Sequence, residues 1–82
     1  IVMHELGVLC HAIKTVDSIA EKNGIEKIKF LTLEIGDEST FVPAFFDKLY
    51  PVAIDKFPRM NGSVLKIETI SGKGISIKEI GY

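Results

Sequence analysis

The segment Leu31-Thr32-Leu33-Glu34-Ile35 decides the fold, because its apolar side chains alternate with polar ones. That period of two is typical of a strand with one buried face. We predict a strand over residues 25–35, followed by a turn over residues 36–39. The sequence on either side of this strand changes to a helical period.

Two helices are expected to flank this strand. Upstream, apolar residues recur in steps of three and four from Leu6 to Ala20, and Gly24 stops the pattern, which predicts a helix over residues 5–23. Downstream, Pro43 suits the first turn of a helix, and helical spacing continues to about residue 57. Pro51 lies inside this second helix and should kink it, because proline removes one backbone hydrogen bond.

Two more strands are expected over residues 65–69 and 75–80, where apolar and polar residues alternate again. The short stretch over residues 71–74 between them predicts a hairpin. The fold class is therefore α/β, more narrowly a two-layer α+β fold of order α-β-α-β-β, with two helices on one face of a three-stranded mixed sheet. We expect its core to contain Leu9, Ile13, Val16, Leu33, Phe46, Leu49, Ile67 and Ile77, and its open face to carry Glu34, Lys66, Glu68 and Lys78.

Composition excludes several classes of protein. The chain has 82 residues, which predicts a single domain, and 46% of them are apolar, which argues against disorder. The formal charge is −1 and the lysines are scattered, so a nucleic-acid-binding surface is not expected. No apolar run is long enough for a membrane span and no signal peptide is visible, so we expect a cytoplasmic protein. We find no sequence signature of an enzyme.

Few residues offer chemistry. Cys10 is the only cysteine and lies beside the apolar stripe of the first helix, so we interpret it as a core residue. His4 and His11 are seven residues apart, about 10 Å along a helix, which is too far for one metal ion. His11 fits a solvated position. His4 is either a helix-entry residue or, if the native chain starts at Met3, part of a chelate with the terminal amine and nearby amide nitrogens. Such an all-nitrogen, square-planar set suits Ni(II) or Cu(II).

Several short motifs, taken in order, resemble the HypA (HybF) family of hydrogenase and urease nickel incorporation proteins. Met3-His4-Glu5-Leu6 ahead of an amphipathic helix resembles the start of that family, and Leu33-Glu34-Ile35-Gly36 resembles its first strand. Pro43 opens the second helix as a proline does there. Asn61-Gly62 through Glu68 and then Ile77-Lys78-Glu79-Ile80 resemble its last two strands. The resemblance covers nearly the whole chain.

The resemblance implies a nickel metallochaperone for metalloenzyme maturation, with Met3, His4 and Glu5 as its metal-binding residues. It implies a nickel GTPase of the HypB type and a hydrogenase large subunit as partners. The chain departs from the family at residues 71–74, where the family inserts a zinc domain with two CxxC pairs, so we expect a single domain over residues 1–82 and no zinc. Ile1 and Val2 also precede Met3.

Two alternatives remain open. One is a metal-free interaction module derived from the same family, and the other is a small-molecule-binding or catalytic domain. We also expect a homodimer, formed through the open edge of the third strand or through the uncovered helix face.

Overall fold

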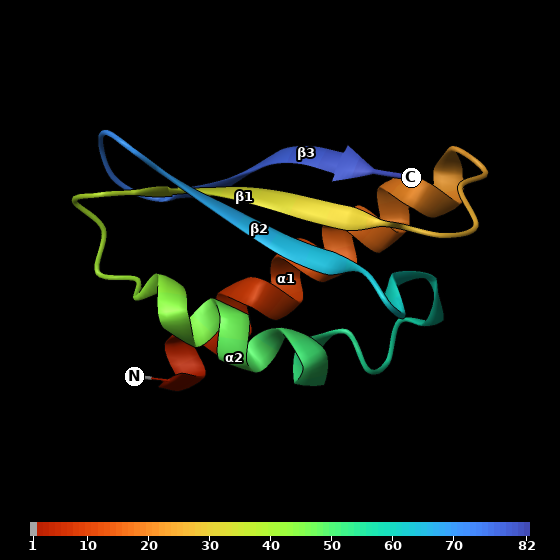
Figure 1. Cartoon of the computed structure of the whole chain (residues 1–82), viewed down its shortest axis with the longest axis horizontal. Coiled ribbons are helices and arrows are strands. Elements are labelled where there is room, and N and C mark those ends of the chain that lie inside the picture. Colours follow the sequence, from red (N-terminus) through yellow and green to blue (C-terminus); the bar gives the residue numbers. More distant parts are fainter. Residues whose placement is uncertain (1) are drawn as a thin grey trace.

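The computed structural model describes residues 2–82, with side chains from His4 onward, and confirms the expected order of elements. Helix α1 (Val2–Lys22) leads to strand β1 (Phe30–Gly36), and helix α2 (Pro43–Ala53) follows. A short 3-10 helix η1 (Pro58–Met60) precedes strands β2 (Val64–Ile70) and β3 (Ile75–Gly81). Both helices lie on one face of the sheet (Figure 1). The two-layer α+β fold with a mixed sheet is confirmed.

The pairing of the last two strands differs from the prediction. The strand order is β2-β1-β3, with β1 parallel to β2 and antiparallel to β3, so the predicted hairpin between β2 and β3 is wrong. Their short connection instead crosses the end of β1 and hydrogen bonds to it. The N–H of Gly36 donates to the carbonyl of Gly74 at 2.9 Å, and the N–H of Glu38 donates to the carbonyl of Gly72 at 2.8 Å.

Gly36 permits this crossing. A Cβ atom at position 36 would lie 2.3 Å from the carbonyl oxygen of Gly72, well inside van der Waals contact. The N–H of Gly72 also donates to the Asp37 carboxylate at 3.1 Å. Two strands on either side of a central strand are about 10 Å apart. Four connecting residues are long enough to span that distance, and the turn glycines take up the sharp bends.

Three boundaries also differ from the sequence prediction by more than one residue. Helix α1 begins at Val2 rather than at residue 5. Strand β1 begins at Phe30 rather than at residue 25, because its neighbour β2 begins at Val64, opposite Phe30. Residues 25–29 form a loop in which the N–H of Ile28 donates to the Arg59 carbonyl at 3.0 Å. Helix α2 ends at Ala53, two residues beyond Pro51, and η1 follows after a turn.

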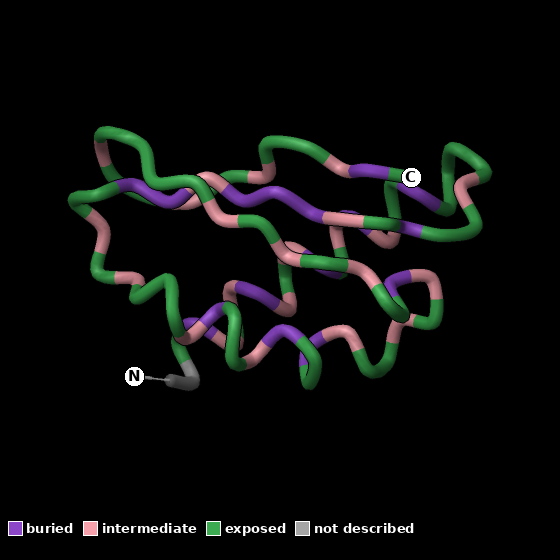
Figure 2. Tube along the Cα trace, viewed as in Figure 1, coloured by how far each residue is buried: buried purple, intermediate pink, exposed green. Residues whose placement is uncertain are grey.

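The core lies between the sheet and the two helices (Figure 2). Of the residues expected there, five are fully buried and the other three, Leu49, Ile67 and Ile77, are half-buried and packed against the rest. Ile67 and Ile77 are half-buried because β2 and β3 are edge strands. Leu49 is half-buried because it lies at the border of the core-facing side of α2. Cys10 is half-buried against the same core. The five fully buried residues are Leu9, Ile13, Val16, Leu33 and Phe46.

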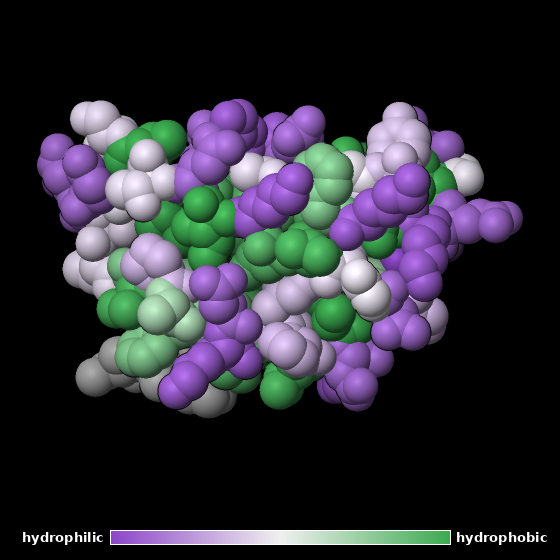
Figure 3. Space-filling view, in the orientation of Figure 1, coloured by the Kyte–Doolittle hydropathy of each residue, from purple (hydrophilic) through white to green (hydrophobic). Residues whose placement is uncertain are grey.

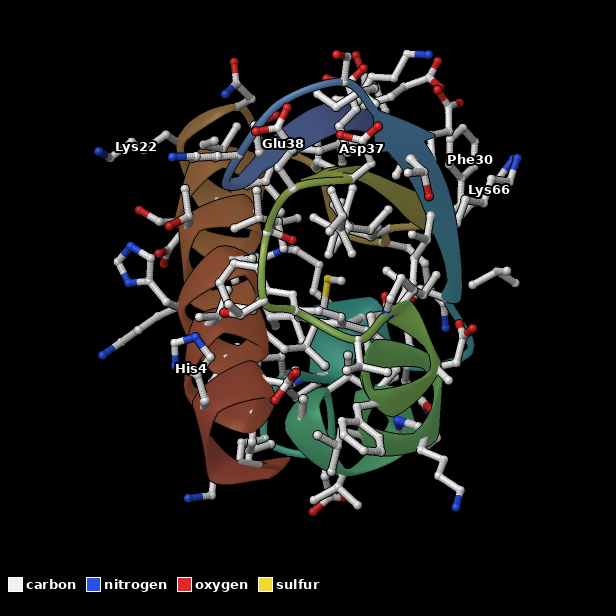
Figure 4. All side chains as sticks on the ribbon, turned by 90° about the vertical axis from the view of Figure 1, so that its left-hand side faces the viewer. His4, Lys22, Phe30, Asp37, Glu38 and Lys66 are labelled. Carbon is white, nitrogen blue, oxygen red and sulfur yellow. The ribbon has the colours of Figure 1, made fainter. Side chains whose placement is uncertain are left out.

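The other face of the sheet carries polar and charged side chains, as predicted. The ammonium of Lys78 hydrogen bonds the Glu68 carboxylate at 2.7 Å, and this bond raises the pKa of Lys78. The ammonium of Lys66 lies 4.0 Å from the centre of the Phe30 ring, on the side of the sheet away from the helices (Figure 4). This face therefore forms a charged layer over the sheet.

Candidate metal centre

His4 lies in the first turns of α1 with its ring exposed to solvent (Figure 4). Its imidazole stacks on the ring of Phe41, with centroids 4.8 Å apart and planes 13° apart. Phe41 in turn packs edge-on against the buried Phe46, with centroids 5.9 Å apart. A stacked aromatic neighbour limits the rotation of the imidazole while leaving its nitrogen atoms free to bind. The His4 ring is therefore oriented by the loop before α2.

Glu5 is the next residue along the chain, yet it is only 1% exposed. One oxygen of its carboxylate, Oε2, accepts a hydrogen bond from the backbone N–H of Val42 at 3.0 Å. The other oxygen, Oε1, is buried and has no hydrogen-bond partner among the described residues. Because Val42 follows Phe41 directly, this bond fixes the loop that carries the ring under His4. Glu5 therefore positions His4 indirectly, through Val42 and Phe41.

The remaining residues singled out in the sequence lie apart from this site. The backbone of Met3 belongs to α1, and its side chain is outside the described residues. His11 is exposed two turns further along the same helix, as predicted. Within the part of the chain that the structure describes, no three His, Cys, Asp or Glu side chains are close enough together to hold a metal ion. Among these described side chains, no group therefore makes a metal site by itself in one copy of the chain.

The backbone of the first turn offers the missing donors. The first four N–H groups of an α-helix have no carbonyl partner within the helix, so the amides of His4 and Glu5 lie in a turn that leaves them without an intrahelical acceptor. The partial positive charge at a helix N-terminus also favours a deprotonated amide over a neutral one. The amides and the exposed His4 imidazole are thus nitrogen donors within a few residues of one another.

Sequence reasoning singled out His4 and Glu5 but missed Phe41 and Val42. These two residues are 37 positions away from His4 and Glu5 along the chain, and they precede the expected start of the second helix. No spacing rule connects such distant positions, because only the packing of α1 against α2 brings them together. The one local signal was a pair of apolar residues ahead of Pro43.

Comparison with known protein families settles what kind of protein carries this arrangement. Residues 3–76 match the model of the family described as hydrogenase/urease nickel incorporation, metallochaperone, HypA. The chain belongs to the HypA family. The match begins at Met3, the first residue of the motif at the site, and continues through both helices and β2. No curated protein and no solved structure matches the chain.

Membership of the HypA family establishes the coarse function. HypA proteins are nickel metallochaperones for the maturation of hydrogenase and urease, and they are not enzymes. The prediction of a non-enzymatic, nickel-handling protein is therefore confirmed. The alternative of a catalytic domain is wrong. Among residues 2–82, no helix is both long and apolar enough to cross a membrane.

Proposed function

We propose that this chain captures Ni(II) at the N-terminal turn of α1, through nitrogen atoms of Met3, His4 and Glu5. The observation that carries the proposal is the oriented, exposed His4 imidazole beside a helix turn with free amide groups. In a chain that starts at Met3, Met3 supplies its amine, His4 its imidazole and an amide, and Glu5 an amide. Four nitrogen donors in a plane suit Ni(II).

The carboxylate of Glu5 has a positioning role in this proposal rather than a bond to the metal. It is buried and accepts a hydrogen bond from Val42, whereas the His4 ring is exposed. A ligand that points into the core cannot reach a metal ion at the surface without leaving Val42. The shape of the site then depends on the contact between the first turn of α1 and the loop at residues 41–42.

We further propose that the chain is a single domain that works without the zinc domain. One cysteine and two separated histidines do not provide the four ligands of a structural zinc site. The connection at residues 71–74, where that domain would lie, hydrogen bonds to the end of β1 on both sides of the crossing. A short connection that is already hydrogen bonded to the end of β1 through Gly72 and Gly74 needs no inserted domain to close the fold.

The partners belong to the same proposal. A metal held at an exposed helix turn passes to another protein by direct contact, and we propose a HypB-type GTPase and a hydrogenase large subunit as those proteins. The alternative is a metal-free interaction module of the same family. It is favoured in a chain that keeps Ile1 and Val2 ahead of Met3, because Met3 then offers an amide in place of an amine.

A nickel titration of three chains tests the proposal. A chain that starts at Met3 should bind nickel, because its amine has a reference pKa of about 8 and loses its proton far more readily than an amide. The same chain with His4→Ala should lose binding. A chain that begins with Ile1 and Val2 should bind much more weakly. Isothermal titration calorimetry measures the affinity, and the absorption spectrum of square-planar Ni(II) identifies the geometry.

His11→Ala is the matched control, since His11 is an exposed histidine on the same helix and lies outside the proposed donor set. Its nickel affinity should equal that of the unaltered Met3-start chain. If His4→Ala and the unaltered chain bind nickel equally well, the site is wrong and the metal-free interaction module takes its place.

A further inference from the structure

The open edge of β2 is complementary to itself. β2 is one of the two outer strands of the sheet, and its seven residues include neither proline nor a bulge. The other outer strand, β3, is protected. Its register against β1 shifts between Thr32 and Leu33, which places Lys78 and Glu79 next to each other on the exposed face. A bulge with adjacent charges discourages strand pairing, and β2 has no such bulge.

The backbone groups of β2 alternate between its two sides. The N–H of Val64 donates to the Lys29 carbonyl, and the carbonyl of Ile70 accepts from the N–H of Asp37, so both ends of the strand bond toward β1. Because this direction alternates along a strand, the groups of Leu65, Ile67 and Thr69 point to the open edge. In Figure 1, β2 crosses in front of β1, and its free side faces the viewer.

A second copy fits this edge in one antiparallel register. With Ile67 opposite Ile67 of the second copy, Leu65 faces Thr69, and each of these pairs brings together residues whose backbone groups point outward. On the exposed face of the sheet, Lys66 then lies opposite Glu68 of the second copy, and Glu68, whose carboxylate also accepts from Lys78 of its own copy, lies opposite Lys66. Opposite charges in directly facing positions stabilise a strand pair.

Neighbouring registers fail on the same criteria. A shift by one residue sets outward backbone groups against inward ones, and a shift by two places Lys66 opposite Lys66 or Glu68 opposite Glu68. The central register also pairs the apolar ends of the strand. Val64 is 56% exposed and Ile70 is 37% exposed, and each would lie opposite the other. Figure 3, which views the molecule from the side of β2, shows exposed apolar side chains across its middle, among hydrophilic ones.

We propose that β2 pairs with β2 of a second copy of this chain, about a two-fold axis that is perpendicular to the sheet and lies midway between the two Ile67 residues. The result is a six-stranded sheet of order β3-β1-β2-β2-β1-β3 with all four helices on one face, because such an axis keeps the two faces apart. Leu65 and Ile67, which are half-buried in one copy, become fully covered. The pairing does not depend on nickel.

Sedimentation equilibrium of the full chain, over a wide range of concentrations, tests the pairing. The chain should show a reversible monomer–dimer equilibrium. Lys66→Glu places a carboxylate opposite Glu68 of the second copy, and Glu68→Lys places an ammonium opposite Lys66. Each change acts at two symmetric contacts and should raise the dissociation constant at least about tenfold. The double variant, which restores opposite charges, should recover the dimer.

Two further variants distinguish pairing through β2 from pairing through another strand edge, and from a loss of the fold. Glu79→Lys reverses a charge on β3 and should leave the dimer unchanged. Thr69→Pro removes an N–H that points away from β1, so it should abolish the dimer while circular dichroism shows the same folded monomer. A chain that stays monomeric at all concentrations overturns the proposal. A dimer whose dissociation constant is unchanged by both single charge reversals also overturns it, and so does a dimer that Glu79→Lys dissociates.

Discussion

Glu5 and His4 are neighbours in the sequence with opposite surroundings. The carboxylate of Glu5 is buried against the backbone of Val42, and the imidazole of His4 is exposed and stacked on Phe41. Since consecutive residues of a helix point about 100° apart, one faces the core and the other faces water. The site therefore combines a fixed inner residue with an accessible outer one.

Substitutions of Glu5 separate its positioning role from metal binding. Glu5→Gln keeps an oxygen that can accept the hydrogen bond from Val42, so stability should change by less than about 1 kcal/mol. Glu5→Ala leaves that N–H without an acceptor and opens a cavity, which should cost about 2–4 kcal/mol. Urea unfolding of the three chains measures both effects.

The same variants report on nickel. In a Met3-start chain, Glu5→Gln should keep the nickel affinity, because the proposed donor at this position is the amide nitrogen. A large loss of affinity in Glu5→Gln, without a loss of stability, would make the carboxylate a ligand and contradict the positioning role.

At the scale of the elements, the connection between β2 and β3 is the feature that sets the topology. It passes so close to the end of β1 that only glycine fits at position 36. The hydrogen bonds from Gly36 and Glu38 to the connection hold it there. This crossing places β2 and β3 on opposite sides of β1, and it leaves both of them as edge strands.

Two glycine substitutions test the importance of this close approach. Gly36→Ala forces a methyl group into the carbonyl of Gly72, so the connection must shift, and we expect a loss of about 1–3 kcal/mol. Gly7→Ala is the matched control. Nothing lies within 4 Å of a Cβ at Gly7, which is exposed inside α1, so alanine should stabilise the chain by about 0.5–1 kcal/mol. Thermal unfolding of both variants gives the comparison, and equal effects of the two would contradict the tight crossing.

At the scale of the whole molecule, the fold should be independent of zinc. The core formed by the sheet and both helices contains twelve buried apolar residues, which is enough to close a small two-layer domain without a metal. We expect the melting temperature at neutral pH to be the same with and without a strong chelator, and elemental analysis to find no bound zinc. A chelator that unfolds the protein would show that a metal holds it together.

Local patterns in the sequence determined most of the secondary structure, the buried face of each element and the family. The alternation of Leu31, Leu33 and Ile35 predicted a strand with one buried face, and the spacing along α1 predicted which of its residues meet that face. The short motifs around His4 and Glu5 indicated the HypA family. Such patterns are readable because the periods of helices and strands are fixed by backbone geometry.

Only the tertiary structure decided how distant segments meet. A four-residue connection allows either a hairpin or a crossing of β1, and the crossing is held by the close packing and the hydrogen bonds around Gly36. In the same way, the His4 ring stacks on Phe41 because α1 packs against α2. Strand partners and contacts between distant residues are non-local, so no period in the sequence encodes them.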